Sequence, residues 1–196
     1  WGFKVAICEQ LSKNSDLNSE IIDRKVVRVV TPGTVIEDSI IDQKSNNYLA
    51  SIFLEKDQCG IAYTDITTGE FLTTQIKKDD IASEINRISP AELLVRSLDK
   101  PNLENLDSEL SEIEEFDFGS KKCFESLLNH FQVSSMESFG CHELPLSIRA
   151  AGAIIHYLQI QAPELLAQIN TLRTYNIHNY MSLDKQTMRN LELFEG

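Results

Sequence analysis

The sequence lacks the features that would place it in several common protein classes. No apolar run approaches the roughly 20 residues that a membrane-spanning helix needs, so no membrane partner is expected. The four cysteines form no Cys-x-x-Cys pair, and the adjacent Cys141-His142 is poor spacing for metal ligands. There is neither a G-x-x-x-x-G-K phosphate loop nor a G-x-S-x-G nucleophile turn. We therefore predict no catalytic, cofactor-binding or metal-binding residue, and the sequence assigns no DNA-binding residue.

A secretory signal is also missing, and scattered cysteines without one are typical of a reduced, cytoplasmic chain. The sequence begins at Trp1, directly before a predicted strand, and ends at Gly196, within a predicted helix. We therefore expect it to be part of a longer protein. Its composition, 42% hydrophobic and 24% charged, is that of a folded globular chain.

Basic residues are scarce, with 18 Lys and Arg against 30 Asp and Glu and a formal net charge of -12. Such a surface repels phosphates, which argues against a general nucleic-acid binder. Much of the acid lies in one stretch, at Glu104, Asp107, Glu109, Glu112, Glu114, Glu115 and Asp117. We interpret this stretch as a linker with a solvated loop and helix face. The alternative is a stand-alone acidic adaptor that binds a basic partner.

Runs of apolar and β-branched residues predict strands at 3–8, 24–30, 48–54, 59–66, 71–76 and 91–95. Pro32-Gly33 suits a type II turn, and Thr67-Thr68-Gly69 suits a tight hairpin in which Gly69 supplies a positive φ. Helical spacing of apolar residues predicts helices at 81–88 and 121–131, a longer one from 147, and helical residues over 165–172. The predicted N-caps are Asp79 or Asp80, Ser147 and Asp184.

Antiparallel strands followed by a helix and a further strand are typical of a ribonuclease H-like α/β layer. We therefore predict an α/β fold with a mixed sheet and flanking helices over residues 48–162. A β-rich partial domain over 1–36 and a linker over 37–47 precede it. The start of an α-helical domain follows over 163–196.

A ribonuclease H-like sheet raises one enzymatic alternative, a metal-dependent nuclease. Such a nuclease needs carboxylates gathered around two metal ions, one of them from the middle of the first strand. The strand at 48–54 carries none, and Glu55 stands only at its end. We interpret Asp65 as a turn-capping residue. The acids that a nuclease could use are Asp65, Glu70, Glu92 and Asp99.

Several stretches occur together in a characteristic order along essentially the whole chain. They are residues 5–10 with 26–34, residues 47–50 with 65–71, and residues 150–158 with 183–184, 187 and 189–193. In series they resemble the MutS family of bacterial DNA mismatch repair proteins. One departure is Met188, where the family usually has a basic residue.

The resemblance implies a role for each part. Residues 1–36 would end a mismatch-recognition domain, 48–162 would form a ribonuclease H-like connector without nuclease activity, and 163–196 would begin the helical core, or lever. The family's Phe-x-Glu reading motif, DNA clamp and ATPase would lie outside this chain. Phe116-Asp117-Phe118 and Phe194-Glu195 are not that motif.

The resemblance also implies partners. The longer protein would be a DNA-dependent ATPase that uses ATP and Mg, binds mismatched double-stranded DNA as a homodimer and associates with the nucleoid. The connector would couple mismatch binding to the ATPase and contact the partner MutL, without being an enzyme itself. We expect the helix at 121–131 to lie at the MutL surface, with Glu125 and Ser126 as the nearest candidates. Its apolar residues, Phe124, Leu127 and Phe131, are predicted to pack into the core.

Overall fold

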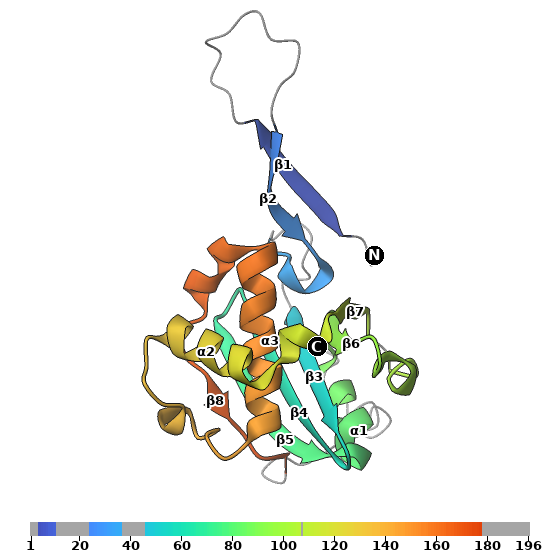
Figure 1. Cartoon of the computed structure of the whole chain (residues 1–196). Coiled ribbons are helices and arrows are strands. Elements are labelled where there is room, and N and C mark those ends of the chain that lie inside the picture. The colour runs from blue at the N-terminus through green and yellow to red at the C-terminus, as the bar shows by residue number, and fades with distance from the viewer. Residues whose placement is uncertain (1–3, 11–23, 37–45, 107, 178–196) are drawn as a thin grey trace, which may run out of the picture.

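A computed structural model describes residues 4–10, 24–36, 46–106 and 108–177. In these ranges a β-hairpin projects from one end of an α/β body (Figure 1). The hairpin consists of β1 (Val5–Gln10) and β2 (Arg24–Val30), which pair antiparallel. No helix in the described ranges is long and apolar enough to span a membrane.

The body is built on a six-stranded mixed sheet with the order β7-β6-β3-β4-β5-β8. Its centre is an antiparallel meander of β3 (Tyr48–Glu55), β4 (Gln58–Asp65) and β5 (Glu70–Lys77). Parallel strands extend both sides: β6 (Glu92–Arg96), β7 (Leu110–Ile113) and β8 (Arg173–Thr174). The predicted α/β class is confirmed.

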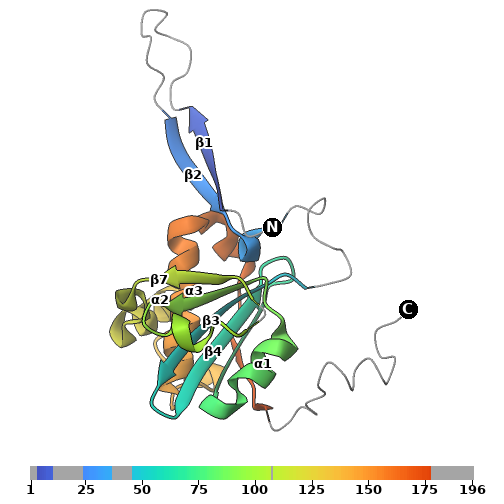
Figure 2. The ribbon, with the colours of Figure 1, turned by 90° about the vertical axis from the view of Figure 1, so that its right-hand side faces the viewer.

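Helices cover both faces of the sheet, so the body has layers of helix, sheet and helix (Figure 2). On one face α3 (Pro145–Gln161) packs on the sheet and α2 (Ser120–Phe131) packs against α3. On the other face lies α1 (Ile81–Ile88). Short 3-10 helices complete the body: η1 (Pro32–Thr34), η2 (Lys78–Asp80), η3 (Lys100–Asn102), η4 (Glu115–Phe118), η5 (Glu137–Phe139) and η6 (Pro163–Gln168).

Strand alternation explains how one sheet serves two apolar cores. Successive side chains of a strand point to opposite faces. Leu49 and Leu94 accordingly belong to the core beneath α3, whereas Ala50 and Leu93 belong to the core beneath α1. The predicted hairpin at Thr67-Thr68-Gly69 is confirmed, and Gly69 has a φ of 74°.

The predicted type II turn at Pro32-Gly33 is wrong. These residues form η1, and Gly33 is not among the glycines with positive φ. The Thr31 backbone N–H donates to Thr34 Oγ1 at 2.8 Å, and the Thr34 N–H donates to the Thr31 carbonyl at 2.9 Å. This reciprocal bonding closes the turn in helical form, which removes the need for a positive φ.

The interpretation of the acidic stretch as a linker is also wrong, because it contains β7 and η4. In β7 the side chain of Ser111 is buried while that of Glu112 is exposed. The acid therefore occupies the solvent side of an edge strand. Phe118, at the end of η4, is fully buried and holds the segment on the body.

The long helix begins earlier than predicted, and Ser147 does not cap it. Its N-cap is Leu144, and Ser147 donates from Oγ to the Leu144 carbonyl at 2.8 Å from inside the first turn. Pro145 explains the difference, because proline is favoured at the first helical position. Asp80 does occupy the N-cap position of α1, without a side-chain capping bond.

The segment after α3 packs on the sheet instead of continuing as the predicted helix over 165–172. Here η6 ends at Gln168, and β8 then pairs with β5 through Leu72–Arg173 and Thr73–Thr174. Leu165, Ile169 and Leu172 are buried in the core beneath α3. The domain boundary predicted at residues 162 and 163 thus falls inside a packed part of the body. Asp184, Met188, Phe194-Glu195 and the family stretch over 183–193 lie outside the described residues.

Candidate functional site

The acids considered for a nuclease do not meet. Asp65 pairs in register with Tyr48 and Glu70, so these three side chains share one face of the sheet. Glu92 pairs in register with Leu49, whose side chain points to the opposite face. Because the sheet separates Glu92 from the other two acids, a two-metal site built on these residues is excluded. Among the described residues, no group of three or more His, Cys, Asp and Glu could hold a metal ion.

Each of the other three acids has a local structural partner. Asp65 Oδ1 accepts from the Thr67 N–H at 2.9 Å and from Thr67 Oγ1 at 2.6 Å, which confirms its predicted turn-capping role. Glu70 accepts from the Tyr48 hydroxyl at 2.8 Å. Asp99 accepts from Arg96 Nε at 2.6 Å in a buried ion pair.

The Glu92 carboxylate, at the start of β6, accepts four hydrogen bonds. Its exposed fraction is 0%. Oε2 accepts from Thr31 Oγ1 at 2.5 Å and from the Gly33 N–H at 3.0 Å. Oε1 accepts from Ser111 Oγ at 2.6 Å and from the Tyr157 hydroxyl at 2.9 Å. We call these five residues the Glu92 cluster.

The Glu92 cluster joins four separate segments: the stretch after β2, β6, β7 and α3. Every donor to the carboxylate is neutral. Burial and the nearby carboxylate raise the pKa of Tyr157 above its ordinary value, so its hydroxyl stays protonated and able to donate. The arrangement is suited to holding these segments together. Both oxygens of the Glu92 carboxylate already accept hydrogen bonds from the protein, so neither is free to exchange a proton with a substrate.

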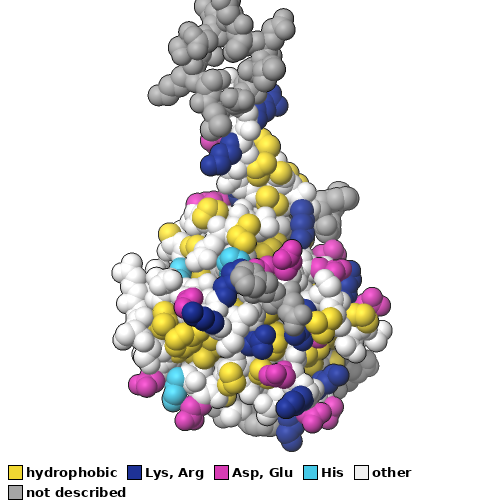
Figure 3. All heavy atoms as spheres, viewed as in Figure 1, with side chains coloured by type: hydrophobic (Ala, Val, Ile, Leu, Met, Phe, Trp, Pro, Cys, Tyr) yellow, Lys and Arg dark blue, Asp and Glu magenta, His cyan; other side chains and the backbone are white. Residues whose placement is uncertain are grey.

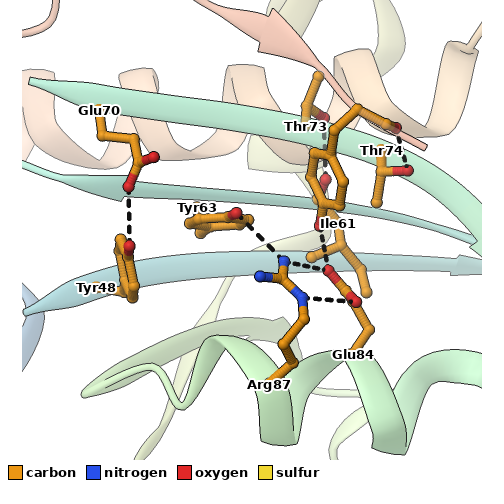
Figure 4. Close-up of polar contacts among 9 residues, drawn as sticks. Tyr48, Ile61, Tyr63, Glu70, Thr73, Thr74, Glu84 and Arg87 are labelled. Atoms are coloured by element: carbon orange, nitrogen blue, oxygen red, sulfur yellow. Dashed lines mark hydrogen bonds and ion pairs between the residues drawn. The ribbon is translucent and has the colours of Figure 1, made fainter. Parts of the chain in front are cut away.

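A second buried carboxylate lies on the other face, at Glu84 of α1 (Figure 4). Glu84 Oε1 accepts from the Tyr175 hydroxyl at 2.5 Å and from Arg87 Nη2 at 2.6 Å. Arg87 also donates to the Tyr63 hydroxyl at 3.3 Å, and its guanidinium carbon lies 5.8 Å from the Tyr63 ring centroid. We call these four residues the Glu84 cluster. It fixes the stretch after β8 on α1.

Sequence reasoning named Glu92 only as a possible metal ligand and did not name Glu84. A signal existed for Glu84, because it falls between Ile81 and Ile85 on the apolar face of an amphipathic helix. An acid at that position requires a buried partner. For Glu92 the corresponding signal is an acid that opens the otherwise apolar run Leu93-Leu94-Val95.

The helix predicted to form a partner surface has both buried and exposed apolar residues. Leu127 is buried, and the Phe131 ring centroid lies 4.9 Å from that of Phe139, so their predicted packing is confirmed. Phe124 is wrong as a core residue, because it is 37% exposed at the helix surface. Glu125 is also exposed, and Ser126 is half-buried.

Part of the acidic stretch is paired within the chain. Lys100 Nζ lies 2.6 Å from Glu112 Oε1, and this hydrogen bond lowers the pKa of Glu112. Asp117 Oδ1 lies 2.8 Å from Lys122 Nζ and 3.0 Å from His156 Nε2. These contacts reduce the negative charge available to an outside basic partner.

Fold and buried clusters together define a mixed α/β module with an attached β-hairpin, whose polar centres bind its own segments to each other. Two family models match this sequence: MutS domain I over residues 1–39 and MutS domain II over residues 47–170. The second match covers more than half of the chain. The chain therefore belongs to the MutS family of DNA mismatch repair proteins, as its motifs predict.

Relatives named DNA mismatch repair protein MutS agree with this. The protein of Dehalococcoides mccartyi is 40% identical over 100% of this chain and 23% of its own length. That of Halothermothrix orenii is 40% identical over 98% of this chain and 22% of its own length. That of a Synechocystis species is 36% identical over 98% of this chain and 24% of its own length. The chain thus spans about a quarter of the length of these relatives.

Proposed function

We propose that this chain is the connecting part of a MutS protein and catalyses no reaction itself. It would join a mismatch-recognition domain, which includes residues 1–36, to a helical core within the longer protein. We place the end of the connector after β8, because η6 and β8 pack on the sheet. The remaining residues, 178–196, would begin the helical core.

The observation that carries this proposal is the direct junction between the two regions that separate family models match. Gly33 approaches β3 and β6 so closely that a Cβ there would lie 2.9 Å from Leu49 Cβ and 3.0 Å from Glu92 Cβ. Asn47 Nδ2 donates to the carbonyls of Pro32 at 3.0 Å and Val35 at 3.3 Å. Such a tight junction is suited to passing a change in one region on to the other.

The strand arrangement supports a ribonuclease H-like connector. Three antiparallel strands come first, then α1, then β6 parallel to β3, with β7 beyond it. Ser51, in the middle of β3, is buried and is not a carboxylate. This supports a fold used for connection and not for metal-dependent cleavage.

We further propose that the activities of the longer protein lie outside these residues. It would bind mismatched double-stranded DNA as a homodimer and hydrolyse ATP with Mg in the cytoplasm, at the nucleoid. The connector would couple mismatch binding to that hydrolysis. Family membership and the absence of a phosphate loop from this sequence support this division.

A chimera tests the connecting role. The chain replaces the matching segment of the Dehalococcoides mccartyi relative, in a bacterium that lacks its own MutS. We expect the chimera to lower the spontaneous mutation rate, and the purified protein to hydrolyse ATP at different rates with mismatched and matched duplexes. A folded chimera whose hydrolysis is the same with both duplexes contradicts the coupling. The control is the same chimera with Gly60→Leu, which should disrupt the body. A Cβ at Gly60 would lie 2.0 Å from the Leu146 carbonyl oxygen.

We propose the exposed side of α2 as the surface that contacts MutL. It presents Phe124 between Lys121 and Glu125, whose charged groups lie 3.8 Å apart. Exposed aromatic residues within a polar rim are typical of contact sites. We expect Phe124→Ala to weaken binding of purified MutL at least tenfold in calorimetry, and the matched control Leu98→Ala, at another exposed apolar residue, to leave it unchanged. Equal affinity of wild type and Phe124→Ala contradicts this surface.

A further inference from the structure

We propose that Glu92 is a positioning residue that sets the orientation of the β1–β2 hairpin against the α/β body. This deepens the connecting role proposed above and rests on it. The two oxygens of this one carboxylate have different partners. Oε2 accepts from Thr31 and Gly33, which follow the hairpin, and Oε1 accepts from Ser111 and Tyr157, which belong to the body.

The hairpin needs such an anchor because the body does not hold it by packing. All residues of β1 are exposed, and β2 becomes half-buried only over its last three residues, at its base. Val5 and Val26 are 55% and 51% exposed. Figure 3 shows hydrophobic side chains at the surface of the projecting hairpin. The direction in which the hairpin projects is therefore set by contacts at its base.

Among the contacts at that base, those of Glu92 are the most deeply buried. Arg28 Nε lies 3.2 Å from Glu164 Oε1, but the Glu164 side chain is half-exposed, and ion pairs of that kind contribute little. Asn47 bonds only to backbone carbonyls of the junction. Glu92, Thr31 and Thr34 are all within 1% of complete burial.

The chemistry of the Glu92 cluster makes its geometry strict. Four neutral donors surround the buried Glu92 carboxylate in place of water. Losing a donor leaves an oxygen of a buried charge unsatisfied. The junction can therefore shift only if Thr31 and Gly33 both leave Oε2, and the network favours one orientation of the hairpin.

The cysteines of the chain allow this orientation to be measured. All four are free thiols; Cys8, on β1, is exposed, and Cys59, Cys123 and Cys141 are buried. A spin label on Cys8 and a second on Lys121→Cys, at a highly exposed position of α2, report the distance between hairpin and body. Pulsed electron resonance on the full 196-residue chain gives the distribution of that distance.

We expect a single narrow distribution in the parent and at least a twofold broader one in Glu92→Gln, whose amide cannot accept all four bonds. Thr31→Val, which removes the hydroxyl donor to Oε2 together with its contact to Thr34 Oγ1, should also broaden it. Ser111→Ala removes a donor to Oε1 and leaves the bonds from Thr31 and Gly33 to Oε2 in place. Glu84→Gln replaces the buried carboxylate of the Glu84 cluster, on the opposite face of the sheet. Both controls should lower the melting temperature without broadening the distribution.

An unchanged width in Glu92→Gln despite a lower melting temperature overturns the proposal, because Glu92 would then only stabilise the body. If Glu92→Gln does not fold, Thr31→Val decides, and an unchanged width there overturns the proposal as well. Broadening in the Glu84→Gln control to the same extent also overturns it. These distances do not depend on mismatch repair, so their failure is distinct from failure of the chimera.

Discussion

The Tyr175 hydroxyl donates a hydrogen bond to Glu84 Oε1 across 2.5 Å, and this contact joins the residue after β8 to helix α1. Both side chains are buried. Burial and the Glu84 carboxylate hold the pKa of Tyr175 above its ordinary value, so the hydroxyl donates at any physiological pH. The far end of the described chain is thereby fixed to the face of the sheet opposite to Glu92.

Removing this hydroxyl should weaken the body measurably. We expect Tyr175→Phe to lower the free energy of unfolding by about 1–3 kcal/mol, the usual cost when a buried charged group loses a hydrogen bond. Urea titration followed by circular dichroism measures the loss. The control is Tyr48→Phe, because the bond of Tyr48 to Glu70 is exposed and should contribute less. Equal losses in the two variants contradict the importance assigned to the Glu84 cluster.

At Gly152, α3 packs directly against Cys123 of α2. A Cβ there would lie 2.4 Å from Cys123 Cβ and 2.5 Å from Cys123 Cα, so the backbone of one helix must move. We expect Gly152→Ala to cost about 1–3 kcal/mol or more, although alanine is the better helix former. Thermal unfolding checks this. Gln159→Ala, at an exposed position of the same helix, is the control and should change stability by no more than about 0.5 kcal/mol.

The buried thiols predict a loss of stability at alkaline pH. Burial raises the pKa of Cys59 and of Cys123 to about 12, and burial also raises that of Cys141. An unfolded thiol ionises near pH 8.5, so the folded chain holds these protons more tightly. Their contribution is therefore complete below about pH 8.5 and is lost as the pH rises toward 12, by about 1.4 kcal/mol per pH unit for each thiol.

Urea midpoints at pH 7, 8.5 and 10 measure this decline. The urea midpoint of Cys123→Ala should fall less steeply with pH than that of the parent, because one buried thiol has been removed. The buried tyrosines, whose pKa values are also raised, are the same in both proteins. A decline of the same slope in parent and variant would show that the Cys123 thiol does not ionise on unfolding in this range.

Much of the fold follows from local pattern. Runs of apolar and β-branched residues predict β2 to β6 at nearly their observed bounds, and Ile81, Ile85 and Ile88 predict α1. By contrast β7 could not be predicted, because its residues Leu110–Ile113 lie in an acidic stretch. It forms by pairing with β6 and by burial of its neighbour Phe118. Those contacts are not local, so the local pattern does not contain them.

The Glu92 cluster could not be predicted from the sequence, because its contacts are not local either. The donors to Glu92 are Thr31, Gly33, Ser111 and Tyr157, which are 61, 59, 19 and 65 residues away in the sequence. No spacing rule pairs residues so far apart. A carboxylate in a buried strand indicates that partners exist, and only the fold identifies them. The turn role of Asp65 could be predicted because its partner Thr67 is two residues away.

Substitutions of Asp65 can distinguish a role in the turn from a role in metal binding. Because its carboxylate accepts two bonds from Thr67, we expect Asp65→Ala to lower the free energy of unfolding by about 0.5–2 kcal/mol, as for loss of a helix cap. Asp65→Asn keeps an accepting oxygen and should lose less. Melting temperatures with and without Mg²⁺ or Mn²⁺ provide the comparison. The metal should leave the parent and both variants unchanged, whereas a metal-dependent rise in the parent that Asp65→Asn abolishes would assign this carboxylate to an ion.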